Sequence, residues 1–476
     1  MQITKREFLK KLGLGAIGLA SGSAFADEYV ETREGLPAGS VGDPDNAWFG
    51  KHIFDLKHTM VDGPSAYMAN GKVMQPAREV PIFHETDVVV VGGGPAGFAA
   101  AVAAARTGAK VALVERYGSL GGLFTNGMVL LMMATSRKEE SGKWTIVTRG
   151  ICEEFMKRAE ALGADVSTRK PKGEKLSYQW MPTVDPEGAK YLMDQMIAEA
   201  GVEMFFHSWG VDVIQDGAKV LGVIFESKQG RQAILAREVI DCTGDGDLFF
   251  AAGADYRQIT HSIGFVTRLG NMDRVTAKET PKDADGKALE GVWMRRGNEA
   301  NPSTAWCNTI GPQGNGLSVK ELSKAEVEQR KYWWEHVRLM RRTPGWEQVF
   351  IANTCSQIGP RVTRLMRSGC VVDRAMLKGA WAPADSIGWC GVDGRHAAFQ
   401  IPYRALVPEG VENMLAAGRC IGAPDTCDTF RLICPCFVMG EAAGTAAALA
   451  VKSGKAPRQI DVKALRATLE AHGACV

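Results

Sequence analysis

The spacing of hydrophobic residues becomes regular at about residue 87. Asp87 is followed by four consecutive valines, which is the pattern of a strand buried on both faces. Residues 98–107 are rich in alanine and indicate a helix, which Gly108 can end as a C-terminal cap. A second apolar run covers residues 111–115. The pattern therefore predicts a strand, a crossover helix and a second, parallel strand.

Weaker periodicity predicts the remaining elements. Residues 205–225 alternate as a small antiparallel sheet does, with a hairpin turn at residues 215–217. Residues 27–83 lack strong periodicity, so we expect an irregular arm over the surface. We expect further strands at 237–242 and 413–417, and further helices at 186–200, 320–341 and 436–452.

A glycine-rich turn, Gly92-Gly93-Gly94-Pro95-Ala96-Gly97, joins the first strand to its helix. Gly92 makes the tight turn, Gly94 lets a pyrophosphate lie against the backbone, and Gly97 lets the helix pack close to the sheet. The helix N-terminus attracts phosphate charge. Glu115 ends the second strand, where its carboxylate can bind ribose hydroxyls. Together these features predict a dinucleotide site, and Arg116 leaves a phosphorylated nicotinamide dinucleotide open.

Three later motifs extend this site. A glycine-rich loop after Glu115 can close over the pyrophosphate, and two more strands end in tight turns near residues 243 and 418. The N-terminus of the helix that follows the last strand can stabilise negative charge. The expected cofactor-binding residues are Gly92, Gly94, Pro95, Ala96, Gly97, Glu115, Arg116, Gly121, Gly122, Thr125, Thr243, Gly244, Asp245, Gly418, Arg419, Gly440 and Ala443.

Size and composition narrow the class of protein. A chain of 476 residues is long enough for two connected domains with a large core. A net charge of +2 gives no strongly basic face, so we expect no nucleic-acid partner. The eleven cysteines are spaced neither as a disulfide framework nor as paired metal-binding motifs, so we expect no metal.

The first 26 residues have the arrangement of an export signal. Lys5 and Arg6 precede a short apolar stretch, and Ala24-Phe25-Ala26 provides a small-residue cleavage site. The stretch is shorter than the roughly 20 residues that span a bilayer, so we expect no integral membrane span after cleavage. The charged region resembles a twin-arginine signal with Lys5 in place of the first arginine. We expect a periplasmic protein, with ordinary secretion or an uncleaved anchor as alternatives.

The four motifs, in this order, resemble the FAD-dependent oxidoreductases of the glutathione-reductase-type two-domain superfamily. The C-terminal part of the chain resembles one branch of this superfamily at four places. These are Ile401-Pro402-Tyr403-Arg404, the Ala-Gly-Arg-Cys-Ile run that ends at Ile421, the single residue Arg431, and the small-residue helix that begins near Gly440. The resemblance covers roughly residues 84–455, and it indicates the cofactor and the fold more specifically than the substrate. Cys427 and Cys434 depart from the pattern of that branch.

The resemblance implies an α/β fold: a Rossmann-like, discontinuous FAD-binding domain with an inserted α+β substrate domain. FAD would span the first strand–helix–strand unit, with its isoalloxazine near the C-terminal helix. The expected boundaries are 1–26 for the export signal, 27–83 for the arm, 84–255 and 401–476 for the two parts of the FAD-binding domain, and 256–400 for the substrate domain.

The resemblance also places the substrate pocket between the flavin and the middle domain. Arg361 could bind a carboxylate through its planar fork, as could Arg364 beside it. A histidine with a near-neutral pKa could take the proton that leaves with a hydride. By position, the candidate catalytic residues are Arg361, His396, Tyr403 and Arg431. Structural hydrogen bonding is the alternative for each.

Two further groups of residues, the tryptophans and the C-terminal cysteines, each have more than one possible role. Seven of the eleven tryptophans lie in residues 256–400, either as an aromatic substrate pocket or as packing and partner surface. Cys434 and Cys436 are either a redox-active pair or two free buried thiols, because a bridge across one residue is strained. A bridge from Cys427 to one of them is also open.

We therefore expect an exported FAD-dependent oxidoreductase, a dehydrogenase or a reductase, that transfers hydride between a small organic substrate and flavin N5. NAD(P)H does not reach an exported enzyme, and no second dinucleotide turn follows a strand, so we expect electron exchange with a cytochrome or quinone. An electron-relay subunit of a larger complex, and a non-redox hydratase or isomerase with structural FAD, remain alternatives.

Overall fold

The computed structural model describes residues 66–162, 183–277, 281, 292–298, 301–377, 381–393 and 397–476. The chain divides into compact units at residues 1–60 and 61–476, and the described residues all belong to the second. The predicted export signal and the first part of the predicted arm lie outside the described residues. So does His396.

The main sheet combines parallel and antiparallel strands in the order β7-β4-β3-β10-β9-β8, with β21 also paired to β10. All pairs from β7 to β10, and the β10–β21 pair, are parallel, whereas β8, β9 and β10 form an antiparallel meander. The strands are β3 (Ile82–Val91), β4 (Val111–Val114), β7 (Glu203–Phe205), β8 (Trp209–Asp216), β9 (Lys219–Ser227), β10 (Gly230–Asp241) and β21 (Met414–Ala416). This α/β sheet brings the carboxyl ends of β3, β10 and β21 to one edge.

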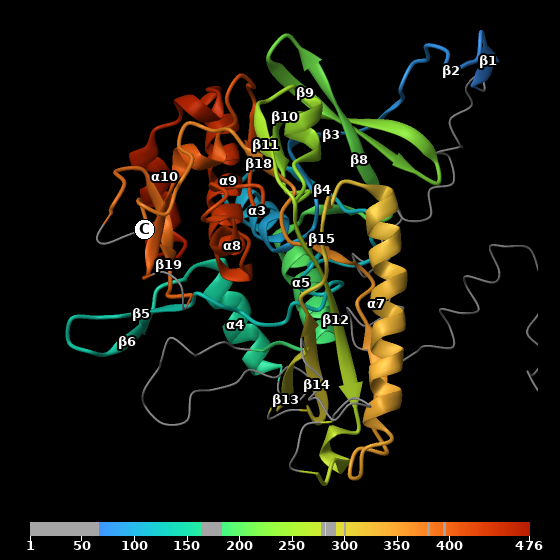
Figure 1. The fold of residues 1–476 in the computed structure, drawn as a ribbon. Helices are drawn as coiled ribbons and strands as arrows, with labels where there is room; N and C mark the ends of the chain where they lie inside the picture. Colours follow the sequence, from blue (N-terminus) through green and yellow to red (C-terminus); the bar gives the residue numbers. More distant parts are fainter. Residues whose placement is uncertain are drawn as a thin grey trace, which may run out of the picture. The chain divides into compact units, whose positions relative to one another are not determined.

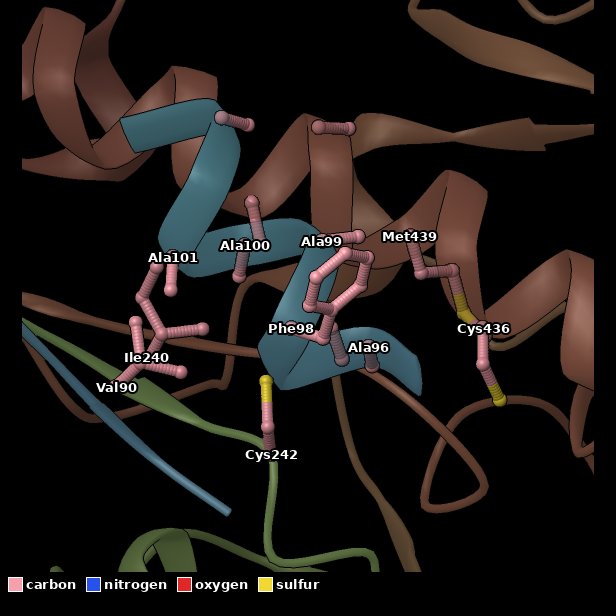
Figure 2. Packing of buried hydrophobic residues seen from close by; sticks show 14 of the residues in the cluster. Val90, Ala96, Phe98, Ala99, Ala100, Ala101, Ile240, Cys242, Cys436 and Met439 are labelled. Carbon is pink, nitrogen blue, oxygen red and sulfur yellow. The ribbon is translucent and has the colours of Figure 1, made fainter. Parts of the chain in front are cut away.

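Two helices that are far apart in the sequence pack side by side on this sheet, α3 (Pro95–Arg106) and α9 (Ile433–Ser453) (Figure 1). Figure 2 shows Ala96, Phe98 and Ala99 of α3 next to Cys436 and Met439 of α9. The backbones come this close because a Cβ at Gly440 or Gly444 would overlap the carbonyl oxygen of Ala96 or Ala100. Helix α9 is long and apolar enough to cross a membrane, yet 94% of its most apolar window is buried inside the protein.

Further helices cover this pair. They are α4 (Ile151–Ala161), α5 (Pro186–Ala200) and α10 (Val462–Ala471), with the short helices α6 (Asp247–Ala251) and α8 (Cys427–Phe430) near the sheet edge. The 3-10 turns are η4 (Met272–Arg274), η5 (Tyr403–Leu406) and η6 (Pro457–Gln459). Asp185 and Asp461 are the N-terminal caps of α5 and α10, and their carboxylates accept backbone N–H groups of the first turn.

A second, antiparallel sheet is built around β12 (His261–Gly270), which pairs with β14, β15, β16 and β17. Its other strands are β13 (Val292–Asn298), β14 (Asn301–Thr309), β15 (Gln313–Gly314), β16 (Phe350–Thr354) and β17 (Gly359–Pro360). Helix α7 (Val319–Met340) packs on this sheet over a separate hydrophobic core (Figure 1). Small two-stranded pairs complete the fold: β1 (Tyr67–Ala69) with β2 (Lys72–Met74), β5 (Ser136–Lys138) with β6 (Trp144–Ile146), β11 (Tyr256–Gln258) with β18 (Arg364–Met366), and β19 (Ser386–Cys390) with β20 (Phe399–Pro402).

Most of the predicted elements are present with small shifts in their ends. The first strand is longer than predicted, because β3 starts at Ile82, and the last long helix starts three residues earlier, at Ile433. The predicted irregular arm is wrong for its described end, where β1 and β2 form a hairpin. Local periodicity could not show this hairpin, because its strands have three residues each.

Three of the seven tryptophans of residues 256–400 serve packing, whereas Trp334 is exposed. Trp306, Trp333 and Trp346 are buried in the core under α7. The indole of Trp333 donates to Thr309 Oγ1 at 2.8 Å, and the indole of Trp306 donates to the carbonyl oxygen of Met128. Buried indoles with satisfied N–H groups are structural.

Glu441 is a buried carboxyl group in the middle of α9. Its Oε2 accepts the backbone N–H of Ile151 at 3.0 Å, at the start of α4, whereas no described residue bonds Oε1. Burial raises the pKa of Glu441 to about 8, against the lowering effect of the Ile151 amide. The folded protein therefore favours the neutral carboxyl group.

We expect Gly444→Ala to lower the free energy of unfolding by about 2 kcal/mol or more, because the added methyl group pushes α9 away from α3. Chemical denaturation of the cofactor-free protein measures this. Gly94→Ala is the matched control, since a Cβ there meets no atom within 4 Å. Equal stability of the two variants would contradict the packing argument.

Glu441 should also make stability depend on pH. Its pKa is higher in the folded chain than in the unfolded chain, so its contribution is complete below the unfolded value of 4.5 and is lost as pH rises through about 8. We expect Glu441→Gln, which keeps an acceptor for Ile151, to reduce the fall in unfolding free energy between these limits by a few kcal/mol. Denaturation curves of both proteins at the two pH limits test this, and parallel losses would refute it.

Candidate functional site

A cavity lies at the carboxyl ends of β3, β4, β10 and β21. Its empty volume is about 810 Å³, which includes space that is open to solvent. In an open α/β sheet this edge is where ligands bind. Its lining residues come from the turns after these four strands, from β8, from the segment before β17, and from the start of α9. They include Gly92, Gly94, Pro95, Ala96, Glu115, Arg116, Gly122, Thr243, Gly244, Gly418, Arg419 and Arg431.

The turn between β3 and α3 combines close packing with open space. A Cβ at Gly92 would overlap the carbonyl group of Cys242, and one at Gly97 would overlap the carbonyl oxygen of Gly92. A Cβ at Gly94 would instead project into open space, and Gly94 lines the cavity. This turn therefore offers a phosphate group an uncovered backbone at the N-terminus of α3.

Glu115 follows β4 and is 5% exposed. Its Oε2 accepts the backbone N–H of Gly93 at 2.6 Å, and its Oε1 accepts that of Tyr117 at 2.8 Å. Burial raises the pKa of Glu115, and these two amide donors oppose the rise. The carboxyl group is thus fixed between the first glycine turn and the chain after β4. Its oxygens have further lone pairs for ribose hydroxyls.

Arg116 extends the same wall of the cavity. Its guanidinium carbon lies 4.9 Å from the centre of the Tyr117 ring and 5.2 Å from the Trp209 ring. All three residues line the cavity. The guanidinium group and the two rings thus form the wall of the cavity next to Glu115.

Asp241, at the end of β10, holds the third turn. Its carboxylate accepts four hydrogen bonds, from Thr243 N at 3.0 Å, Thr243 Oγ1 at 2.7 Å, Leu248 N at 2.9 Å and Phe249 N at 3.0 Å. Burial raises its pKa, while these donors lower it. Asp241 was not among the predicted site residues, although an acid two residues before a Thr-Gly turn was a visible signal.

Arg419 carries positive charge into the cavity. Its Nη2 donates to Asp245 Oδ1 at 2.7 Å, and Thr363 Oγ1 donates to the same oxygen at 2.7 Å. Arg364 supports the loop from outside, through Asp245 O at 2.9 Å and Asp247 Oδ1 at 3.0 Å. Arg419 Nε is buried and has no partner among the described residues. An oriented, partly unpaired guanidinium group in a cavity fits a pyrophosphate.

The start of α9 forms another part of the cavity, through Arg431, Ile433 and Cys436. Arg431 Nε donates to Asp428 Oδ1 at 2.7 Å. Gln357 lies on the segment between β16 and β17, is 7% exposed, and has no hydrogen-bond partner for Oε1 among the described residues. The sequence analysis missed Gln357, Ser208, Trp209 and Gly210, which line the cavity from chain positions without a recognisable motif.

Several expected cofactor-binding residues act behind the cavity instead of lining it. The hydroxyl of Thr125 donates to Leu120 O, and Gly121 N donates to Gly93 O at 2.7 Å, so this pair shapes the loop that carries Gly122. Asp245 holds Arg419. Gly440 and Ala443 are buried in α9, and Gly440 allows its contact with α3. These residues support the cavity lining in this structure, and their expected contact with the cofactor stays a prediction.

The four catalytic candidates also differ in whether they line the cavity. Tyr403 is 4% exposed, its hydroxyl donates to Pro457 O at 2.8 Å, and it does not line the cavity. This favours structural hydrogen bonding, the alternative stated for it. Arg361 does not line the cavity either; its backbone N–H donates to Ser262 O at 3.3 Å. Arg431 lines it. His396 lies outside the described residues.

The cysteines are free thiols, and Cys434 and Cys436 form no bridge with each other or with Cys427. Cys436 lines the cavity, and burial raises its pKa to about 12. A thiol with such a pKa stays protonated at neutral pH and is a poor nucleophile. The structure therefore favours buried thiols over a redox-active pair.

Comparisons with known proteins identify one family over most of the chain and short stretches of several enzymes. Residues 87–469 match the family model described as FAD dependent oxidoreductase. Dihydrolipoyl dehydrogenase from Trypanosoma brucei brucei is 59% identical over 49 residues, 10% of this chain and 10% of that protein. Sarcosine oxidase subunit alpha from Corynebacterium is 33% identical over 110 residues, 20% of this chain and 11% of that protein. The matches thus span only about a tenth of the length of these curated relatives.

Among solved structures, the chain is similar to a geranylgeranyl bacteriochlorophyll reductase-like protein from Thermoplasma acidophilum, with 14% identity, 82% of this chain and 83% of that chain covered, and a TM-score of 0.42. It is also similar to p-nitrophenol 4-monooxygenase from Pseudomonas putida, with 13% identity, 82% and 89% covered, and a TM-score of 0.42. The family match covers the glycine turns, Glu115, Arg419 and α9 together. The chain belongs to the FAD dependent oxidoreductase family, and its cofactor is FAD.

Proposed function

We propose that this protein is an exported FAD enzyme that transfers hydride between a small organic substrate and flavin N5. The observation that supports the proposal is one continuous cavity that joins the dinucleotide turn at Gly94 to the polar side chains of Arg431 and Gln357. FAD supplies the hydride chemistry when it is bound. The protein binds, orients and shields it.

The residues of the cavity suggest how the chain holds the cofactor. Gly94 and the N-terminus of α3 bind the pyrophosphate. The guanidinium group of Arg419, which Asp245 holds, adds an N–H at Nε that has no partner among the described residues. Glu115 binds the adenosine ribose, beside the surface of Arg116 and Trp209. The N-terminus of α9, a helix of 21 residues, favours negative charge at the other end of the cofactor.

The second sheet supplies the substrate side in this proposal. Gln357 reaches the cavity from the segment between β16 and β17, so the region of residues 256–400 acts as the substrate domain. The predicted export signal supports a periplasmic location by the twin-arginine route. There the enzyme would exchange electrons with a cytochrome or quinone, because NAD(P)H is not supplied in that compartment.

We expect Gly94→Ala to lose most of its FAD while the cofactor-free protein keeps its stability. The new methyl group would occupy the space where the pyrophosphate lies, and it meets no protein atom within 4 Å. The flavin content after reconstitution, together with denaturation of the cofactor-free protein, measures both effects. Full flavin content in the variant would contradict the placement of the pyrophosphate at Gly94.

An anaerobic titration identifies the class of reaction. The absorbance of the flavin-loaded protein is recorded while candidate substrates are added. Loss of the visible flavin band on addition of a substrate class, followed by recovery with a quinone or cytochrome, is the expected result. Bleaching by dithionite alone, with recovery by an organic acceptor, would favour a reductase. Product formation without any bleaching would overturn hydride transfer in favour of non-redox chemistry with structural FAD.

A further inference from the structure

Arg431 reaches the cavity in a fixed orientation. It follows α8 directly, and both its Nε (2.7 Å) and its Nη2 (2.6 Å) contact Asp428 Oδ1. Only 16% of its side chain is exposed. These two contacts use Nε and Nη2 but not Nη1, so Asp428 holds the guanidinium group from one side. Arg431 also lines the cavity. A planar guanidinium group held in this way is suited to a carboxylate.

His261 holds Asp428 from the second sheet. His261 begins β12, and its Nε2 lies 3.4 Å from the same Oδ1 of Asp428, while its Nδ1 lies 2.7 Å from the backbone nitrogen of Ser262. The sequence analysis selected neither His261 nor Asp428. Three side chains from two distant parts of the chain thus form one polar connection that ends at the cavity.

Three charged groups act on the His261 ring. Asp428, Arg431 and Arg361 are the charged groups that face the ring. Burial lowers the pKa of His261 first, Arg431 and Arg361 lower it further, and Asp428 raises it. Arg431 and Asp428 form an ion pair beside the ring, and Arg361 is the third charged group near it.

Gln357 provides an independent sign of a ligand. It is 93% buried, lines the same cavity, and its Oε1 lacks a partner among the described residues. A buried amide oxygen without a partner costs free energy unless a ligand or water satisfies it. A ligand with a hydroxyl or amine donor next to an anionic group would satisfy both Gln357 and Arg431.

We propose that the substrate is a small carboxylate bound by Arg431, and that Asp428 and His261 are positioning residues that orient Arg431. The proposal rests on the function proposed above for its flavin chemistry, whereas the binding site itself is a property of the chain. Arg431 touches the substrate, Asp428 fixes Arg431, and His261 fixes Asp428 and changes the charge of the group when it takes a proton.

The test is a titration of the flavin-loaded protein with sodium acetate or propanoate at constant ionic strength. Difference spectra of the flavin report binding near the flavin, and calorimetry reports binding whether or not flavin is present. Acetamide and inorganic phosphate are the matched ligands. We expect saturable binding of the carboxylates and none of acetamide; equal binding of acetamide, or preference for phosphate, would overturn the carboxylate assignment.

Variants separate the roles. We expect Arg431→Gln to weaken carboxylate binding about tenfold or more, Arg431→Lys to weaken it less, and Asp428→Asn to weaken it with normal flavin content. Arg367→Gln is the control, because Arg367 is 64% exposed and pairs with Asp255 and Glu409. Unchanged binding in Arg431→Lys and Asp428→Asn would refute the proposal even if Arg431→Gln does not fold.

The pH profile tests His261 as a positioning residue. Burial holds the pKa of His261 below its ordinary value of about 6.5. Protonation adds positive charge beside Asp428, so carboxylate binding should tighten several-fold as pH falls from about 8 to well below about 6.5. His261→Gln should remove this dependence and retain binding at the higher pH. A profile that is the same in His261→Gln would overturn its role. Failure of any substrate to bleach the flavin, with carboxylate binding intact, would instead reject only the proposed reaction.

Discussion

The close approach of backbone to backbone at the edge of the main sheet is the constraint on which the rest of the structure depends. The turn after β3 packs on the end of β10, and α3 packs on α9, at distances that side chains would prevent. Gly92, Gly97, Gly440 and Gly444 each lack the Cβ that would overlap a carbonyl group. Because these contacts are backbone contacts, they fix the positions of chain segments more than 300 residues apart. The cavity exists where one glycine, Gly94, has no such contact.

Buried charged side chains also hold the turns at this edge of the sheet in place. Asp241 uses four hydrogen bonds to hold the turn after β10, and Asp245 orients Arg419 from that turn. Burying such groups is unfavourable unless each is paired, so the pairing fixes their geometry. Glu115 shows the same principle, because its two oxygens join the turn after β3 to the chain after β4. Paired buried groups therefore fix the turns that border the cavity.

The second sheet adds chemistry that the main sheet lacks. Its core of buried tryptophans supports β12 and the segment that carries Gln357. His261 at the start of β12 contacts Asp428 in α8, so the second sheet is joined to the short helix that precedes Arg431. Residues on both sides of the cavity are thus positioned by separate hydrophobic cores.

The sequence by itself determined the helices, strands and motifs that depend only on residues close to one another in the chain. A run of valines, an alanine-rich helix and a glycine turn with an acid at the next strand end specify a dinucleotide unit within about 30 residues, and the order of the motifs indicated FAD. Gly440 and Ala443 were recognised as part of a motif, but only the packing of α9 on α3 showed that they support the site and do not line it. Tyr403 belonged to a motif as well, and its hydroxyl proved to be bound to Pro457. Gln357, Trp209, His261 and Asp428 had no local signal, because their proximity to the cavity depends on which strands pair and which helices meet. Only the tertiary structure could decide that, since hydrogen bonds and burial between distant segments are set by the whole fold.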